Sequence, residues 1–251
     1  MVKALKSKNS HGFDEISMRL LKISAVYICS PLTYICNKSI LSGNLPDHMK
    51  FSVIKPIFKK GNKMNLTNYR PISLLTYFSK VFEKALFNRL TAHFNTNKLL
   101  VGNQFGFRKG IATEDAIFKL INETLNALNN NKKMVGSIFC DLEKVFDSVN
   151  HDILLSKLPY YGINGKAKLL LESYLQNTYQ SVQITNCHFN SNTVSEWTKI
   201  KYGVPQGSIL GPLLFLIYIN DLPKAIEHKA LPILFADNTS ILLTSLNNIQ
   251  M

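Results

Sequence analysis

Acidic residues are scarce in this chain, which has 16 Asp and Glu against 29 Lys and Arg and a formal net charge of +13. The imbalance is greatest from Lys50 to Lys80, where seven basic residues and no acidic residue occur. An excess of this size favours a polyanionic partner, and nucleic acid suits it better than a membrane surface. A basic loop that only faces solvent is the alternative explanation for this stretch.

Cysteine is also sparse, and long apolar runs are missing. The four cysteines form no Cys-x-x-Cys pair and have no His cluster beside them, which argues against a zinc site. No apolar leader follows Met1, and the most apolar run, residues 209–219, is interrupted by Gly211 and Pro212. It is too short to span a bilayer. We therefore expect reduced thiols, an intracellular protein and no membrane partner.

Several catalytic signatures are absent from the sequence. There is no Gly-x-Gly-x-x-Gly, no phosphate-binding loop and no Gly-x-Ser-x-Gly, which argues against dinucleotide binding, P-loop chemistry and serine hydrolysis. Asn150-His151-Asp152 stands at an expected helix start, so capping explains this cluster better than catalysis. With 46% apolar and 18% charged residues, the composition is that of a folded globular protein.

The spacing of apolar residues predicts both helices and strands. Helices are expected over residues 14–41, with a break near Pro31, and over 78–94, 113–129, 153–158, 166–175 and 208–219. In residues 113–129 the apolar face, with Ala116, Ile117, Leu120, Ile121 and Leu125, is expected to point inward. Strands are expected over residues 52–58 and 70–74 (a basic hairpin), 134–142, 180–184 paired with 197–201 across the loop 186–192, and 233–235 with 240–244.

Two short apolar runs end on an aspartate: Phe139-Cys140-Asp141-Leu142 and Phe235-Ala236-Asp237-Asn238. Adjacent strands that each deliver a carboxylate can form a divalent-metal site for phosphoryl transfer. One ion lowers the pKa of the attacking hydroxyl, and a second stabilises the leaving pyrophosphate. From spacing alone, a turn aspartate at each strand end is the more common explanation.

Two further places suit contact with a nucleotide. The segment Tyr202–Pro212 has glycines around a proline before an apolar helix, which gives an accessible turn where Gln206 can hydrogen-bond a sugar or base. Phe146, five residues after Asp141, can sense a sugar 2′-hydroxyl. A plain loop–helix junction and a core aromatic ring are the alternatives at these two places.

Five segments in a fixed order give the chain a resemblance to a known family. They are Asn68–Leu74, Gln104–Arg108, Phe139–Asn150, Tyr202–Pro212 and Phe235–Asn238. They resemble successive motifs of reverse transcriptases, especially those of non-LTR (LINE-like), jockey-type retrotransposons, from about Gly12 to the C-terminus. The resemblance implies an α+β fold of the right-hand polymerase type, with an antiparallel palm sheet packed on helices and no thumb.

The resemblance also implies a domain division and partners. Residues 1–49 would be an N-terminal helical extension, 50–131 the fingers and 132–251 an incomplete palm, with the reverse transcriptase domain at about 40–251. The implied activity is RNA-directed DNA polymerisation on an RNA template and a DNA primer with deoxynucleoside triphosphates. The implied location is the cytoplasm and nucleus.

Site residues follow from the same resemblance, position by position. Asp141 and Asp237 would be catalytic carboxylates that bind two Mg²⁺ ions, or Mn²⁺ in their place, together with the Leu142 carbonyl. The substrate-binding residues would be Phe146 as the sugar gate, Gln206 and Gly207 at the incoming nucleotide, and Arg70 with Lys59 or Lys60 at its triphosphate.

The chain departs from the family pattern at three places. Asn238 stands where the family has a second Asp, which makes it a degenerate catalytic position, and Val145 replaces a small Ala. Loss of one carboxylate near two dications costs on the order of 4 kcal/mol, or roughly a thousandfold in rate. The chain also ends soon after the last hairpin, so we expect a truncated, impaired polymerase. A non-catalytic RNA-binding remnant and an inert fragment are the alternatives.

Overall fold

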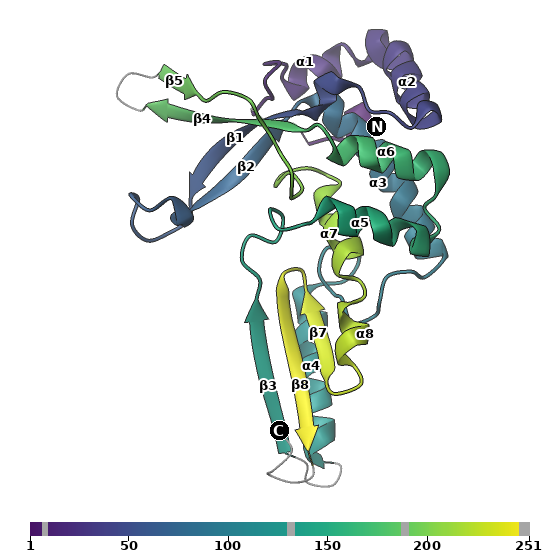
Figure 1. Ribbon diagram of the computed structural model, residues 1–251, viewed down its shortest axis with the longest axis vertical. Coiled ribbons are helices and arrows are strands. Elements are labelled where there is room, and N and C mark those ends of the chain that lie inside the picture. Colours follow the sequence, from purple (N-terminus) through teal and green to yellow (C-terminus); the bar gives the residue numbers. More distant parts are fainter. Residues whose placement is uncertain (7–9, 130–133, 187–190, 246–251) are drawn as a thin grey trace. The chain divides into compact units, whose positions relative to one another are not determined.

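The computed structural model describes residues 1–6, 10–129, 134–186 and 191–245 (Figure 1). The chain divides into two units, each of which is discontinuous in sequence. Unit 1 consists of Met1–Ala92 and Phe146–Leu214, and unit 2 of His93–Val145 and Phe215–Met251. Helices and strands occur in both units, which confirms the mixed α+β class. The division into an N-terminal extension, fingers and palm stays a prediction.

Unit 1 contains a five-stranded mixed sheet of β1 (Phe51–Phe58), β2 (Tyr69–Leu75), β4 (Tyr179–Asn186), β5 (Ser191–Val194) and β6 (Thr198–Lys199). Its order is β2-β1-β4-β5, and β6 also pairs with β4. β1 and β2 are antiparallel, which confirms the basic hairpin, and β1 and β4 are parallel. The expected pairing across residues 186–192 is confirmed for β4 and β6. β5 was not expected, and residues 187–190 lie outside the described residues.

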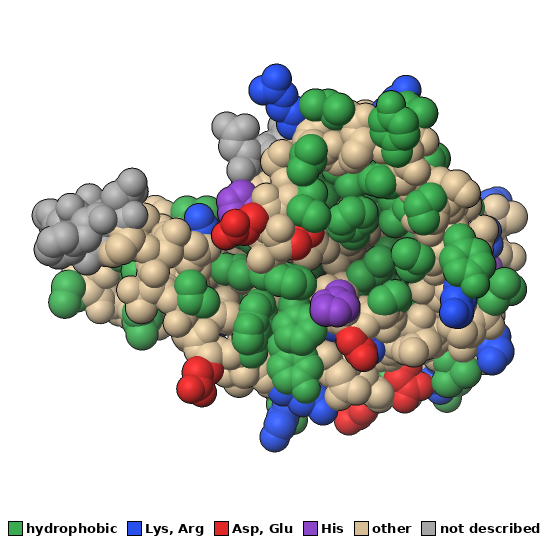
Figure 2. Space-filling model, turned by 90° about the horizontal axis from the view of Figure 1, so that it is seen from above, with side chains coloured by type: hydrophobic (Ala, Val, Ile, Leu, Met, Phe, Trp, Pro, Cys, Tyr) green, Lys and Arg blue, Asp and Glu red, His purple; other side chains and the backbone are tan. Residues whose placement is uncertain are grey.

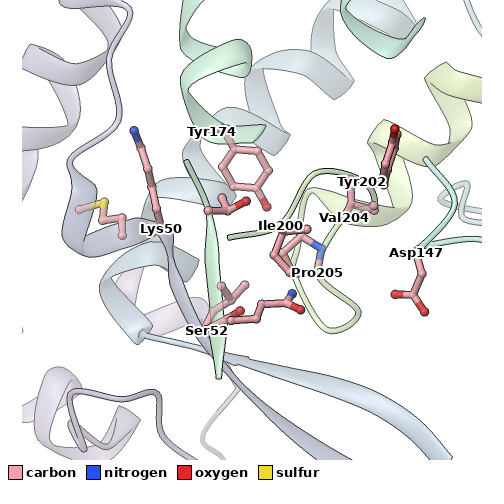
Figure 3. A pocket seen from close by; sticks show the side chains of 13 residues that line it. Lys50, Ser52, Asp147, Tyr174, Ile200, Tyr202, Val204 and Pro205 are labelled. Atoms are coloured by element: carbon pink, nitrogen blue, oxygen red, sulfur yellow. The ribbon is translucent and has the colours of Figure 1, made fainter. Parts of the chain in front are cut away.

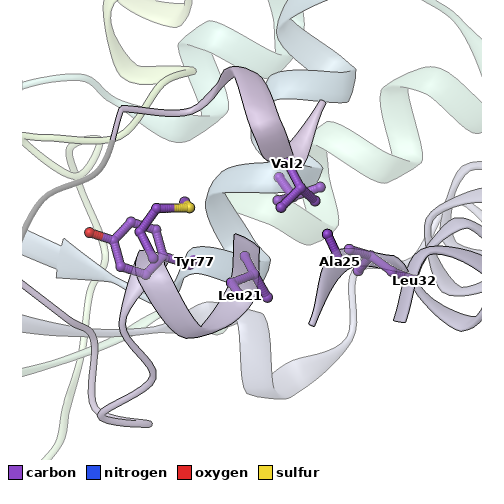
Figure 4. Close-up of a cluster of buried hydrophobic side chains, with 7 residues drawn as sticks. Val2, Leu21, Ala25, Leu32 and Tyr77 are labelled. Atoms are coloured by element: carbon purple, nitrogen blue, oxygen red, sulfur yellow. The ribbon is translucent and has the colours of Figure 1, made fainter. Parts of the chain in front are cut away.

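The helices of unit 1 are α1 (Met18–Ile23), α2 (Ala25–Ser42), the first part of α3 (Tyr77–Thr96), α5 (His151–Lys157) and α6 (Gly165–Leu175), with short 3₁₀ turns at Val2–Ala4, Asp47–Lys50, Leu66–Asn68 and Leu158–Tyr161. The first 3₁₀ turn, α1, α2 and α3 share a hydrophobic cluster (Figure 4). The cluster joins Val2, Leu21 and Leu32 to Tyr77 and Val81 of α3. Each buried side chain of this size contributes roughly 1.5–3 kcal/mol, so the N-terminal helices are anchored on α3.

The predicted break at Pro31 is wrong, because Pro31 lies inside α2. The helix boundary falls instead at Ser24, whose amide and hydroxyl both donate to the Leu20 carbonyl, at 2.9 Å each. A proline removes the amide that would bond to the carbonyl four residues earlier. That carbonyl belongs to Tyr27, which is 85% exposed, so water can replace the missing donor. Capping at α5 is confirmed, since Asn150 Oδ1 accepts the Ile153 amide at 3.1 Å.

Unit 2 contains a three-stranded antiparallel sheet of β3 (Met134–Asp141), β7 (Leu231–Phe235) and β8 (Asn238–Ser245), in the order β3-β8-β7. The helices α4 (Thr113–Asn129) and α8 (Leu222–Ile226) pack against it. The buried helix predicted over residues 208–219 is α7 (Gly211–Ile219), which contributes residues to both units. The hairpin expected around Asp237 is formed by β7 and β8.

The expected burial of the apolar face of α4 is wrong for three of its five residues. Ile117, Ile121 and Leu125 are 51%, 53% and 52% exposed, whereas Ala116 is buried and Leu120 half-buried. The adjoining edge strand β3 also exposes Phe139, by 69%. Helical periodicity identifies which face of a helix is apolar, but it does not identify the element that covers that face.

Apolar side chains are also exposed on unit 1. α1 and α2 lie at the top of Figure 1, and hydrophobic side chains gather over the face that Figure 2 shows from above. On α1 and α2 the most exposed apolar side chains are Val26, Tyr27 and Leu41, at 76%, 85% and 75%. Within the part of the chain that the structure describes, no helix combines the length and apolarity needed to cross a membrane.

Candidate functional site

The two predicted aspartates lie at the same end of the sheet of unit 2. Asp141 ends β3 and is the register partner of Asn238, which begins β8. One residue further on, the Leu142 amide donates to the Asp237 carbonyl at 3.4 Å. Partners on adjacent antiparallel strands have Cα atoms roughly 4.5–5.5 Å apart. Asp141, Leu142, Asp237 and Asn238 are therefore neighbours through strand pairing.

A two-residue turn, Ala236–Asp237, presents one of these aspartates. Phe235 and Asn238 pair across it, and Ala236 has φ 56°. The left-handed conformation costs a non-glycine residue roughly 1–2 kcal/mol. The turn therefore needs support from other residues to keep this conformation.

Gln104 provides that support from a distant part of the sequence. Its Oε1 accepts the Ala236 amide at 3.1 Å and the Gly106 amide at 2.7 Å, and its Nε2 donates to the Ala236 carbonyl at 3.4 Å. Gln104 is 3% exposed. Both polar backbone groups of Ala236 are thus bonded by one buried neutral amide.

Gly106 completes this clamp because no larger residue fits beside the turn. A Cβ atom at position 106 would lie 2.0 Å from the Ala236 nitrogen and 2.7 Å from its Cα. The Phe105 amide also donates to the Leu234 carbonyl at 2.8 Å. Sequence reasoning noticed the segment Gln104–Arg108 without assigning it a role; a glycine two residues after a glutamine was the available signal.

In unit 1, the backbone of Phe146 lies beside the glycine-rich loop. The Val204 amide donates to the Phe146 carbonyl at 2.6 Å, and the Gly203 amide donates to the Val149 carbonyl at 2.7 Å. Gly203 has φ +87°, and a Cβ atom there would lie 2.8 Å from the Phe146 oxygen. The expected sugar gate and nucleotide loop are therefore joined by main-chain hydrogen bonds.

The Gln206–Gly207 turn contacts β2 of the basic hairpin. The Ser73 amide donates to the Gln206 carbonyl at 2.8 Å, and Gly207 has φ +116° with its hydrogen facing the Ser73 oxygen. Arg70 lies three residues earlier on β2, opposite Ile57 of β1. The side chains of Lys59, Lys60 and Arg70 are exposed. The hairpin therefore presents free cationic groups on the strand pair that supports this turn.

Lys50 differs from the other basic residues of this stretch. Its side chain is 5% exposed and forms an ion pair with Asp47, with 3.1 Å between Nζ and Oδ1. Lys50 lines a cavity of about 220 Å³ together with Asp147, Tyr174, Val204 and Pro205 (Figure 3). Within the basic stretch from Lys50 to Lys80, the charge of Lys50 is therefore buried and paired.

The predicted site residues thus form two groups. Asp141, Leu142, Asp237 and Asn238 belong to unit 2, and Lys59, Lys60, Arg70, Phe146, Gln206 and Gly207 belong to unit 1. The described residues contain no group of three or more His, Cys, Asp or Glu side chains that could hold a metal ion. Asp141 and Asp237 are the carboxylates of the first group, and Asn238 supplies a neutral amide beside them.

Comparison with known proteins identifies the family. Residues 57–251 match the family described as reverse transcriptase (RNA-dependent DNA polymerase). This chain belongs to the reverse transcriptase family.

The relatives of this reverse transcriptase domain come from non-LTR retrotransposons. It is 33% identical over 97% of its length to the probable RNA-directed DNA polymerase from transposon BS of Drosophila melanogaster. It is 31% identical over 92% of its length to that of the X-element, and 29% identical over 98% to that of mobile element jockey of the same species. The chain covers 27%, 25% and 27% of these relatives, so it spans about a quarter of their length.

A solved structure supports the fold. Apo telomerase from Candida tropicalis, truncated from its C-terminal domain, matches 93% of this chain and 50% of its own, with a TM-score of 0.57 and 13% identity. At this identity the match concerns the fold alone.

Proposed function

We propose that this reverse transcriptase domain supplies the fingers and palm of an RNA-directed DNA polymerase, and that Asn238 impairs its catalysis. The observation that carries the proposal is the strand register that makes Asp141, Leu142 and Asp237 neighbours in unit 2. The reaction would join the primer 3′-oxygen to the α-phosphorus of a deoxynucleoside triphosphate and break the bond to pyrophosphate.

The donor groups fit a hard divalent cation. Asp141, Asp237 and the Leu142 carbonyl offer oxygen ligands, and Mg²⁺ usually takes one or two carboxylates together with water and substrate phosphates. When bound, Mg²⁺ would supply the positive charge that activates the hydroxyl and stabilises the leaving group. Asn238 contributes an oxygen without a charge. These ligands would therefore suffice for one Mg²⁺ ion, whereas a pair of ions would need one more carboxylate.

The remaining residues would bind and orient the substrate. Arg70, with Lys59 or Lys60, would neutralise the triphosphate, since all three are exposed on one hairpin. Gln206 and Gly207 would contact the nucleotide, because the positive φ of Gly207 allows close backbone approach. Phe146 would exclude a 2′-hydroxyl.

The Asn238→Asp variant tests the proposal. In a primer-extension assay with primed poly(rA), dTTP and Mg²⁺, we expect incorporation to rise by up to about a thousandfold, because a charge worth on the order of 4 kcal/mol is restored. Mn²⁺ titration followed by electron paramagnetic resonance gives an independent readout, and we expect tighter binding.

Asn122→Asp is the matched control, since it adds the same charge on an exposed position of α4. It should change neither readout. Adding Asp141→Ala to the Asn238→Asp variant should abolish both gains. Gains that survive the loss of Asp141 would refute the assignment of the site.

The second candidate is a non-catalytic RNA-binding remnant, favoured by Asn238 together with the exposed cations of the β1–β2 hairpin. Here we expect RNA affinity that falls linearly with the logarithm of salt concentration. Replacing Lys59, Lys60 and Arg70 by Ala should reduce that slope by about 2, at roughly 0.7 per phosphate contact. The same change at the exposed Lys166, Lys224 and Lys229 is the control. Equal effects of both triple variants would contradict a specific footprint.

A further inference from the structure

Glu83 of α3 is a buried carboxyl group to which nucleotidyl transfer assigns no role. It is 1% exposed and lies in unit 1. Its Oε1 accepts the Tyr174 hydroxyl of α6 at 2.6 Å, and its Oε2 accepts the Ile209 amide at 2.7 Å. Burying a carboxylate is costly unless its oxygens are hydrogen-bonded. These donors therefore define a specific arrangement of three chain segments.

The Ile209 bond links Glu83 to the segment that follows Gln206–Gly207. The backbone of Leu210 also hydrogen-bonds to the Glu83 carboxyl group. Ile209 and Leu210 directly precede α7, and the first amides of a helix have no acceptor within it. Glu83 thus supplies, from another helix, acceptors at the start of α7.

Ser208 extends this network. Its hydroxyl accepts the Gly211 amide at 2.8 Å and also hydrogen-bonds to Tyr174. Its amide donates to the Pro205 carbonyl at 3.1 Å. Glu83, Tyr174 and Ser208 therefore connect α3, α6 and both ends of the Gln206–Gly207 turn.

A cavity adjoins the segment that precedes this turn. Gly203, Val204 and Pro205, which precede it, line the cavity of about 220 Å³ opposite Ser52 and Lys50 (Figure 3). On the β2 side, one backbone hydrogen bond from Ser73 holds Gln206. The acceptors that Glu83 offers support the segment on its other side, directly after the turn.

We propose that Glu83 is a positioning residue that holds the Gln206–Gly207 turn in the conformation that meets the incoming nucleotide. The proposal rests on the proposed function, because the nucleotide contact of this turn is part of that function. Glu83 acts through Ile209 and Leu210, two and three residues after Gly207. Tyr174 orients the carboxyl group, and Ser208 ties Tyr174 to the loop.

This support depends on protonation. Burial raises the pKa of Glu83 to about 7, and the bonds from Tyr174 and Ile209, with the charge of Lys80, oppose that rise. Burial, with the neighbouring Glu83, raises the pKa of Tyr174 well above its usual value, so its hydroxyl stays a donor. Because the pKa of Glu83 is raised, the folded arrangement around its carboxyl group is favoured at low pH. Local opening that exposes this carboxyl group to water becomes easier as pH rises through 7.

Hydrogen exchange at the Ile209 and Leu210 amides tests the proposal without catalysis. In the unaltered chain, protection of these amides should fall by up to about tenfold between pH 6 and pH 8, because pH 8 lies about one unit above the pKa of Glu83. Glu83→Gln imitates the protonated acid and should keep protection near the pH 6 level at both values. Glu83→Ala should lose at least tenfold at both amides, while amides in α6 change less.

The control is Glu123→Gln, the same substitution at a partly exposed carboxylate paired with Lys119 on α4. It should leave the two amides unchanged. A pH slope that persists in Glu83→Gln would overturn the proposal. Equal loss of protection throughout unit 1 in Glu83→Ala would also overturn it, since Glu83 would then only stabilise the fold.

A kinetic measurement separates this proposal from the proposed function. In the Asn238→Asp background, Glu83→Ala should raise KM for dTTP at least tenfold, and Glu83→Gln should raise it less than threefold at pH 6. If Asn238→Asp shows no incorporation, the polymerase proposal fails while the exchange results still decide the role of Glu83. If it polymerises and Glu83→Ala leaves KM unchanged, the role of Glu83 in nucleotide binding is refuted.

Discussion

The two turns that carry the candidate site are supported by different chemistry. In unit 2, the neutral amide of Gln104 bonds both polar groups of Ala236 beside Asp237. In unit 1, the ionisable carboxyl group of Glu83 accepts donors that follow Gln206–Gly207. An amide does not titrate near neutral pH, whereas a buried carboxyl group with a raised pKa does. The comparison indicates that the group supporting the Asp237 turn does not titrate near neutral pH, whereas the group supporting the Gln206–Gly207 turn does.

Gly106→Ala should have the largest effect of all, on the Ala236–Asp237 turn. A Cβ atom 2.0 Å from the Ala236 nitrogen cannot be accommodated unless the hairpin moves. We expect a loss of about 3–5 kcal/mol in the free energy of unfolding, measured by urea denaturation, together with loss of Mn²⁺ binding. Gly102→Ala is the control, because no atom lies within 4 Å of a Cβ there. Similar losses in both variants would count against the clamp.

Gln104→Ala should weaken the same turn by leaving the Ala236 and Gly106 amides without their acceptor. Unsatisfied buried donors cost about 1–3 kcal/mol each, so we expect a loss of roughly 2–4 kcal/mol in unfolding free energy. Faster hydrogen exchange at those two amides would localise the effect. Unchanged exchange there would show that Gln104 does not hold the turn.

Glu83→Gln should change how stability depends on pH. The pKa of Glu83 is raised from 4.5 to about 7, so its favourable contribution is fully present below pH 4.5 and is lost as pH rises through 7. Relative to Glu83→Gln, the free energy of unfolding of the unaltered chain should fall by up to about 3 kcal/mol as pH rises from 4.5 to 7. Urea denaturation at pH 5, 6, 7 and 8 measures this difference. Parallel profiles for the two proteins would exclude titration of Glu83 in this range.

Ser208→Ala should have the smallest effect, because it removes only the acceptor for the Gly211 amide and the bond to Tyr174. Loss of a capping hydroxyl costs about 1 kcal/mol. We expect a decrease of that size in unfolding free energy, with the slope of stability against pH retained. A change in that slope would place Ser208 closer to the titrating group than the hydrogen bonds indicate.

Local sequence patterns predicted the elements of unit 2 that carry Asp141 and Asp237. Each aspartate follows an apolar run of strand length, and two strands with a short polar turn between them form a hairpin. That Asp141 and Asp237 lie together followed only from the resemblance to a family, because spacing alone also suits two unrelated turns. The amphipathic pattern of residues 113–129 correctly predicted the helix α4. The prediction that its apolar face is buried was wrong at Ile117, Ile121 and Leu125.

The supports of both turns were beyond sequence reasoning. Gln104 and Ala236 are far apart in the chain, as are Glu83 and Ile209, and a polar residue that satisfies a distant backbone group leaves no periodic signal. Pro31 shows the reverse case. Its local preference against a helix interior was clear, but the exposed position of Tyr27 lessens the penalty.

The parallel pairing of β1 with β4 has a consequence for synthesis on the ribosome. β1 pairs at once with the following β2, but its other edge is filled only when residues 179–182 have emerged. β3 must likewise wait for β8. Contacts between such distant segments form slowly, and open strand edges attract other chains in the meantime. A nascent chain of this domain therefore exposes at least one open pairing edge from the emergence of β1 until that of β8, and chaperone binding would matter most in that interval.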